Sequence, residues 1–192
     1  MEEKDFVKNA LKIMGFGEEN IDADLVQFVN MWEYKIATKE KPMLLTVGLQ
    51  SCIALYAWEE NFSFLAHMNI VGGNSVYDFE TTDSDIPIKC KKIDRLYEEI
   101  IKSKENIKKP LHIGLVLGVT SKEEDYPSRV IIEKDLKELM DRLEVDGISS
   151  VRVENINCLS FVLDSRDGNI IPGENQPVIS INEINNSSVR GK

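Results

Sequence analysis

Hydrophobic residues recur at helical spacing in four parts of this sequence, and shorter runs with the spacing of strands lie between them. The helical parts are expected at residues 6–14, 25–32, 89–105 and 132–144. The strand-like runs are expected at residues 34–37, 43–47, 51–58, 62–70, 111–119, 148–154, 158–164 and 169–171. Strands dominate the middle of the chain. The pattern therefore predicts an α+β fold with a β-rich core of mixed sheets or a sandwich, flanked by helices.

Three segments are expected along the chain. Residues 1–32 read as an N-terminal helical extension, in which Asp22 or Asp24 caps the second of two short helices. Residues 33–182 hold the strands and the two longer helices and form the main domain. Residues 183–192 are polar and are expected to be a flexible tail.

The composition is that of an ordinary globular protein, with 192 residues of which 42% are apolar and 29% are charged. An excess of acidic side chains, 33 against 23 basic, argues against a nucleic-acid partner. No apolar run approaches the ~18 residues that cross a bilayer, and the first residues lack the features of a signal peptide. We therefore expect a cytoplasmic protein with no membrane insertion.

The few cysteines and histidines narrow the candidate chemistry. Three cysteines and two histidines are spaced neither as a disulfide framework nor as a zinc site, so no metal or other cofactor is expected. Cys52 follows a short turn at the head of a strand. Backbone N–H groups of that turn, at Gly48, Gln50 and Ser51, are placed to bind an oxyanion that develops beside the Cys52 thiol.

The loop between the strands at 51–58 and 62–70 decides whether Cys52 meets His67. A loop at residues 59–60 places the two directly opposite each other, and a loop at 60–61 makes them diagonal neighbours on one face. A three-residue loop places them on opposite faces. In the first two registers the imidazole can take the proton of the thiol, creating a nucleophile for a carbonyl carbon.

Thr46, at the end of the preceding strand, can orient that histidine as a third member of the site. The alternative interpretation is a buried cysteine beside a core histidine. Cys90 is a rival thiol among lysines at a helix start, but no histidine lies at a predictable distance from it. Cys158 is expected in the core, and His112 is expected in a packing or surface role.

Three motifs around these residues resemble the chemoreceptor glutamine deamidase (CheD) family. They are Glu33-Tyr-Lys-Ile-Ala-Thr-Lys-Glu-Lys-Pro42, Met43-Leu-Leu-Thr-Val-Gly-Leu-Gln-Ser-Cys-Ile-Ala-Leu55 and Ala66-His-Met68. The family opens with a G-E-Y strand, continues through T-x-G-L-G-S-C-V-A-V and reaches its histidine in an A-H-x-x-L-P context. The resemblance implies a CheD-like fold and hydrolysis of receptor glutamine side chains to glutamate through a thioester. It makes Cys52 the nucleophile, His67 the base and Thr46 the third member.

The sequence departs from the family pattern at Gln50, where the family has a glycine that serves a left-handed backbone or a close substrate. Two functions therefore follow from the resemblance. One is a deamidase of chemoreceptor-like or other protein substrates, and the other is a catalytically weak or inactive protein-binding module of a signalling pathway. Family members also bind a phosphatase, so a regulatory phosphatase partner is implied. A third candidate is a different cysteine hydrolase or a transglutaminase-like acyl transferase.

Overall fold

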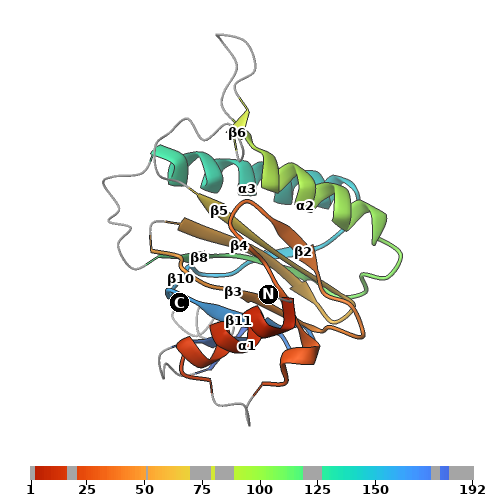
Figure 1. Cartoon of the computed structure of the whole chain (residues 1–192). Coiled ribbons are helices and arrows are strands. Elements are labelled where there is room, and N and C mark those ends of the chain that lie inside the picture. Colours follow the sequence, from red (N-terminus) through yellow and green to blue (C-terminus); the bar gives the residue numbers. More distant parts are fainter. Residues whose placement is uncertain are drawn as a thin grey trace, which may run out of the picture.

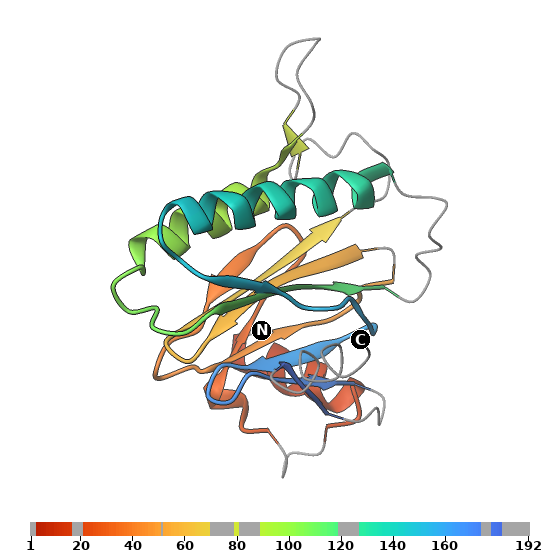
Figure 2. The ribbon, with the colours of Figure 1, turned by 180° about the vertical axis from the view of Figure 1, so that it is seen from behind.

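The computed structural model describes residues 3–16, 21–50, 52–69, 79–80, 89–118, 127–173 and 178–181. The described elements form four layers (Figures 1 and 2). Helices α2 (Lys91–Lys102) and α3 (Pro127–Val145) cover one face of a six-stranded sheet, and a five-stranded sheet packs on its other face. Helix α1 (Glu3–Ile13) covers the outer face of the five-stranded sheet. This arrangement confirms an α+β fold with a β-rich core flanked by helices.

The six-stranded sheet is built around the hairpin of β4 (Cys52–Glu59) and β5 (Phe62–Asn69). Its strand order is β10-β8-β4-β5-β2, and β9 also pairs with β8. The remaining strands of this sheet are β2 (Tyr34–Ile36), β8 (Leu111–Leu117), β9 (Ser150–Arg152) and β10 (Ile156–Asn157). Strand β8 runs antiparallel to β4 and parallel to β9 and β10.

The five-stranded sheet has the order β1-β3-β11-β12-β13. Its strands are β1 (Val26–Phe28), β3 (Met43–Thr46), β11 (Phe161–Asp164), β12 (Asn169–Pro172) and β13 (Ile179–Ser180). Strand β1 lies parallel to β3, and the other pairs are antiparallel. A separate short pair joins β6 (Phe79–Glu80) to β7 (Lys89–Cys90).

The second N-terminal helix predicted at residues 25–32 is wrong. Only one turn of 3-10 helix, η1 (Ala23–Leu25), forms there, capped by the Asp22 side chain, which accepts from the Asp24 N–H. The residues that follow form β1 because pairing with the buried strand β3 outweighs a weak helical pattern in a β-branched stretch. Helix α1 packs on both strands, so the N-terminal residues share a core with the five-stranded sheet. The tail predicted at residues 183–192 lies outside the described residues.

Helix α3 begins at Pro127, five positions before the predicted start at residue 132. Proline is well suited to the first turn of a helix, since its missing N–H has no partner there in any case. None of the described helices is both long enough and apolar enough to cross a lipid bilayer.

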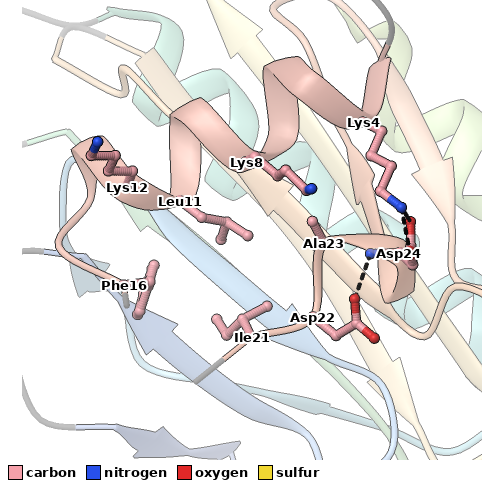
Figure 3. Close-up of a pocket in the computed structure, with 9 residues that line it drawn as sticks. All are labelled: Lys4, Lys8, Leu11, Lys12, Phe16, Ile21, Asp22, Ala23 and Asp24. Atoms are coloured by element: carbon pink, nitrogen blue, oxygen red, sulfur yellow. Dashed lines mark hydrogen bonds and ion pairs between the residues drawn. The ribbon is translucent and has the colours of Figure 1, made fainter. Parts of the chain in front are cut away.

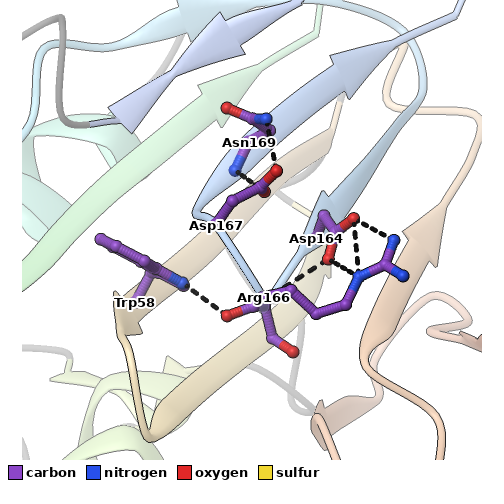
Figure 4. Close-up of polar contacts among 6 residues, drawn as sticks. Trp58, Asp164, Arg166, Asp167 and Asn169 are labelled. Carbon is purple, nitrogen blue, oxygen red and sulfur yellow. Dashed lines mark hydrogen bonds and ion pairs between the residues drawn. The ribbon is translucent and has the colours of Figure 1, made fainter.

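The end of the sandwich opposite Cys52 is held by the turn between β11 and β12 (Figure 4). There the Trp58 indole N–H donates to the Ser165 carbonyl at 3.0 Å, which joins the two sheets. Asp164, which is only 5% exposed, accepts from the Arg166 Nε at 2.9 Å and from its Nη2 at 2.6 Å. The indole also lies against Gly168, whose φ of +72° suits the turn.

Candidate active site

The β4–β5 hairpin takes the second of the two registers that bring Cys52 and His67 to one face. Glu59 pairs with Phe62, so the loop is at residues 60–61. Cys52 therefore lies opposite Asn69 and His67 opposite Ala54, which makes Cys52 and His67 diagonal neighbours. Both side chains are on the face that looks toward the five-stranded sheet, because side chains alternate along each strand.

The register is held by the buried carboxylate of Glu59, which is 1% exposed. Its Oε2 accepts the Asn61 N–H at 2.9 Å and closes the turn. Its Oε1 accepts the N–H groups of Lys108 and Lys109 at 3.4 and 3.3 Å. A one-residue slip would expose this carboxylate and reverse the faces of the strand, so these bonds support the one register.

Thr46 reaches His67 across the gap between the two sheets. It is the last residue of β3, is fully buried, and places its Oγ1 2.8 Å from the His67 Nδ1. The same hydroxyl donates to the Val29 carbonyl at 3.0 Å. The structure thus brings together two of the three predicted catalytic side chains.

These two contacts determine where the ring proton of His67 lies. A hydroxyl has one proton, and a carbonyl oxygen only accepts, so the Thr46 proton points to Val29. The Thr46 oxygen must then accept from an Nδ1–H of His67, which leaves the lone pair on Nε2. In the part of the chain that the structure describes, this buried Nε2 has no hydrogen-bond partner.

Burial sets the charge of the His67 ring. The side chain is 3% exposed, and loss of solvation lowers its pKa to about 4. At neutral pH the ring is therefore a neutral base rather than an imidazolium. The Nε2 accepts no hydrogen bond from Cys52, which is 5% exposed, and a resting thiolate–imidazolium pair would require a charged, buried ring.

The turn before Cys52 differs from the prediction in how it is built. Its left-handed residue is Gly48, with φ of +75°, and Gln50 is exposed with an ordinary negative φ. The Gly48 N–H donates to the Ser160 Oγ at 3.3 Å, so it is already used and is not the predicted oxyanion donor. The role of the Gln50 N–H as an oxyanion donor stays a prediction, and Ser51 lies outside the described residues.

Gly118, just after β8, packs against the same turn. A Cβ on this residue would lie 1.5 Å from the Leu49 carbonyl oxygen and 2.3 Å from that of Gln50. Its N–H donates to the Cys52 carbonyl at 3.1 Å. The Leu49 carbonyl and the Gln50 N–H belong to the same trans peptide and point to opposite sides of the chain. Because the Leu49 oxygen faces Gly118, the Gln50 N–H faces away from it. The only sequence signal for this residue was a glycine at the end of an apolar run.

The other thiols and the other histidine do not join the site. Cys158 is 1% exposed, which confirms the predicted core position, and burial raises the pKa of its thiol to about 12. His112 is half-buried with its ring centroid 5.6 Å from that of Trp58, which confirms a packing role. The Cys90 side chain lies outside the described residues. Within the described ranges, no three or more metal-binding side chains gather in one place.

Among the hollows of the described surface are two that contain none of Cys52, His67 and Thr46. One, of about 660 Å³, lies between α1 and residues 21–24, with Lys8 at its rim and Leu11 and Ile21 in its lining (Figure 3). The other, of about 820 Å³, lies at the β4–β5 turn and residues 37–42. The Thr46–His67 pair is therefore enclosed by the two sheets rather than placed in either of these hollows.

Together, a thiol, a neutral base and an orienting hydroxyl on facing strands are the groups that nucleophilic cysteine chemistry requires. The sequence matches no protein-family model and no curated protein. Side-chain geometry and the motif resemblance are therefore what support a function.

Proposed function

We propose that this protein is a cysteine-dependent protein-glutamine deamidase, with Cys52 as nucleophile, His67 as base and Thr46 as the orienting group. The observation that carries the proposal is the Thr46–His67 contact of 2.8 Å, which leaves Nε2 as the acceptor on the face that also holds Cys52. A histidine serving only as packing does not require a tautomer fixed by a second sheet.

The proposed reaction needs no cofactor. The Cys52 sulfur attacks the carbonyl carbon of the amide while its proton moves to the His67 Nε2. That proton then passes to the amide nitrogen, which leaves as ammonia, and a thioester remains. Water attacks the thioester after giving a proton to Nε2, and the proton returns to the sulfur as glutamate is released.

The motif resemblance supports a chemoreceptor-like or other protein glutamine as the substrate. It also supports a cytoplasmic location and a regulatory phosphatase as partner. The exposed Gln50 is compatible with this proposal, because the left-handed position of the turn is occupied by Gly48. The departure from the family glycine therefore introduces no backbone strain at Gln50.

The second candidate is a non-catalytic binding module of a signalling pathway. The observation that favours it is burial, since Cys52, His67 and Thr46 are all at most 5% exposed. A substrate glutamine reaches such a site only after a local opening of the sandwich. A chain that had lost turnover would keep the same core and would still bind its partner.

The test is conversion of glutamine to glutamate in receptor-derived helical peptides, followed by mass spectrometry and ammonia release. Cys52→Ala should abolish conversion. Cys158→Ala is the matched control, because it removes a thiol from the same inter-sheet core; it should keep the activity. Activity unchanged in Cys52→Ala would contradict the proposal, and binding of these peptides without conversion by the wild type would favour the second candidate.

A further inference from the structure

We infer that residues 29–33, called the clasp from here on, are a positioning element of the site that selects the reactive tautomer of His67. The catalytic consequence of this inference rests on the proposed function, whereas the tautomer itself does not. Residues 29–32 of the clasp lie before the motifs that carry the family resemblance, and Glu33 is the first residue of the first motif. It touches His67 in two independent ways.

The first contact runs through Thr46. The Val29 N–H donates to the Leu45 carbonyl at 2.8 Å, which extends the pairing of β1 with β3 as far as Val29. The carbonyl of Val29 then accepts the Thr46 hydroxyl proton at 3.0 Å. Without this acceptor the hydroxyl is free to rotate and donate to Nδ1. Nδ1 would then lose its proton to Nε2, and Nε2 would no longer have a lone pair to accept a proton.

The second contact holds the backbone of His67 itself. The His67 N–H donates to the Glu33 carbonyl at 3.1 Å, and its carbonyl accepts the Trp32 N–H at 2.9 Å. A bridge between Met31 and His67 accompanies these bonds. The clasp therefore contacts His67 at its main chain directly and at its ring through Thr46.

The clasp is held in its own shape by side chains that take no part in packing the core. The Glu33 N–H donates to the Asn30 carbonyl at 3.0 Å, and the Glu33 Oε2 accepts the Asn30 N–H at 3.2 Å. The Asn30 Oδ1 accepts the Met31 N–H at 2.8 Å. Asn30 and Glu33 are both exposed. Substitutions at these two positions can therefore loosen the clasp without removing core contacts.

Trp32 shows that the clasp is under constraint. Its φ is +70°, the one positive value among the described non-glycine residues. A bulky side chain keeps such a backbone only where its surroundings impose it, and such residues cluster at functional sites. The Lys92 ammonium also donates to the Trp32 carbonyl, which ties the clasp to the start of α2.

The test reads the tautomer directly, by long-range ¹H–¹⁵N NMR of the histidine rings. The chain has only two histidines, so a His112→Gln variant assigns the signals. The wild type should show His67 neutral at pH 7 with the proton on Nδ1. The double variant Asn30→Ala with Glu33→Ala should show a new fraction protonated on Nε2, and kcat should fall about tenfold or more at unchanged KM.

Two controls separate positioning from folding. Asn30→Asp with Glu33→Gln keeps both acceptor oxygens and should restore the wild-type tautomer and kcat. Asp22→Ala removes a cap from the same N-terminal region without touching His67, and should change neither.

The inference is overturned if wild-type His67 carries its proton on Nε2, or if the double alanine variant keeps both the tautomer and kcat. If the tautomer shifts as expected in a protein that deamidates no peptide, the clasp is established. In that case the proposed deamidase function is what fails.

Discussion

The two faces of the β4–β5 hairpin are buried equally but are composed differently. The face under α2 and α3 is apolar except for the buried Glu59 at the end of the hairpin, and its apolar residues are Ile53, Leu55, Ala57, Phe62, Phe64, Ala66 and Met68. The face toward the five-stranded sheet carries His67 and Cys52 together with Tyr56 and Ser63. Both faces are thus shielded from solvent to the same degree, but the inter-sheet face carries far more polar and ionisable side chains than the face under the helices.

The difference extends to hydrogen bonding. Among the described residues, the buried side-chain atoms without a partner are the Tyr56 Oη, the Ser63 Oγ and the His67 Nε2, and all three belong to this hairpin. A buried polar group without a partner lowers stability, and most proteins avoid it. The face under the helices is built for packing, whereas the inter-sheet face keeps groups that packing alone does not explain.

The largest difference in stability should be between alanine substitutions at two adjacent residues of β5, Phe64 and Ser63. Phe64 is fully buried under the helices, with its ring centroid 5.3 Å from that of Tyr34. The substitution Phe64→Ala should therefore lower the free energy of unfolding by about 3–5 kcal/mol. Ser63→Ala on the opposite face should leave stability unchanged or slightly raised, because it removes an unpartnered hydroxyl. Urea unfolding measures both. Equal losses would remove the distinction between the faces.

The next effect is a pH dependence that belongs to the inter-sheet face alone. Burial lowers the folded-state pKa of His67 to about 4 from the usual 6.5 of a solvated imidazole. The unfolded chain therefore binds the extra proton first, and stability present above pH 6.5 is lost as the pH falls through 4. The loss should reach about 3 kcal/mol. It should be much smaller in His67→Gln, where the half-buried His112, whose pKa burial also lowers, still contributes, and an identical decline in that variant would assign the effect to other groups.

The hairpin and its faces follow from the sequence because alternation over two eight-residue strands leaves few registers. The loop at residues 60–61 was one of two that place Cys52 and His67 together, and the buried Glu59 supports it. Periodicity also located α2 and most of α3, whose apolar positions repeat over several turns.

Backbone contributions to the site could not be predicted in this way. The Val29 carbonyl that holds Thr46 leaves no trace in side-chain identity, and residues 26–28 read as helix until β3 is known to pair with them. The role of Gly118 depends on two carbonyl oxygens of a turn about seventy positions earlier. Long-range backbone contacts of this kind become visible only in the folded chain.

Gly118 offers a smaller effect that tests the turn beside Cys52. In Gly118→Ala the new methyl meets backbone oxygens, which yield less readily than a side chain, so about 1–3 kcal/mol of stability should be lost and the reactivity of Cys52 should change. The control is Gly173→Ala, whose Cβ would lie 3.3 Å from two Met14 side-chain atoms and should lose less. Thermal unfolding and alkylation of Cys52 measure the two effects. Unchanged stability and unchanged alkylation in Gly118→Ala would contradict the packing of Gly118 against the turn.

The smallest effect concerns the buried hydroxyl of Tyr56. Its side chain is fully buried, burial raises its pKa, and its Oη has no partner among the described residues. Tyr56→Phe removes an unsatisfied group while keeping the ring against Gly114, so stability should rise by up to about 1 kcal/mol. Tyr97→Phe is the opposite case, because that hydroxyl donates to Asp146 at 2.9 Å and its loss should lower stability by about 1 kcal/mol. Losses of equal size in the two variants would mean that the Tyr56 hydroxyl is satisfied after all. Among the described residues, the unpartnered polar atoms of the inter-sheet face would then be reduced to two, the Ser63 Oγ and the His67 Nε2.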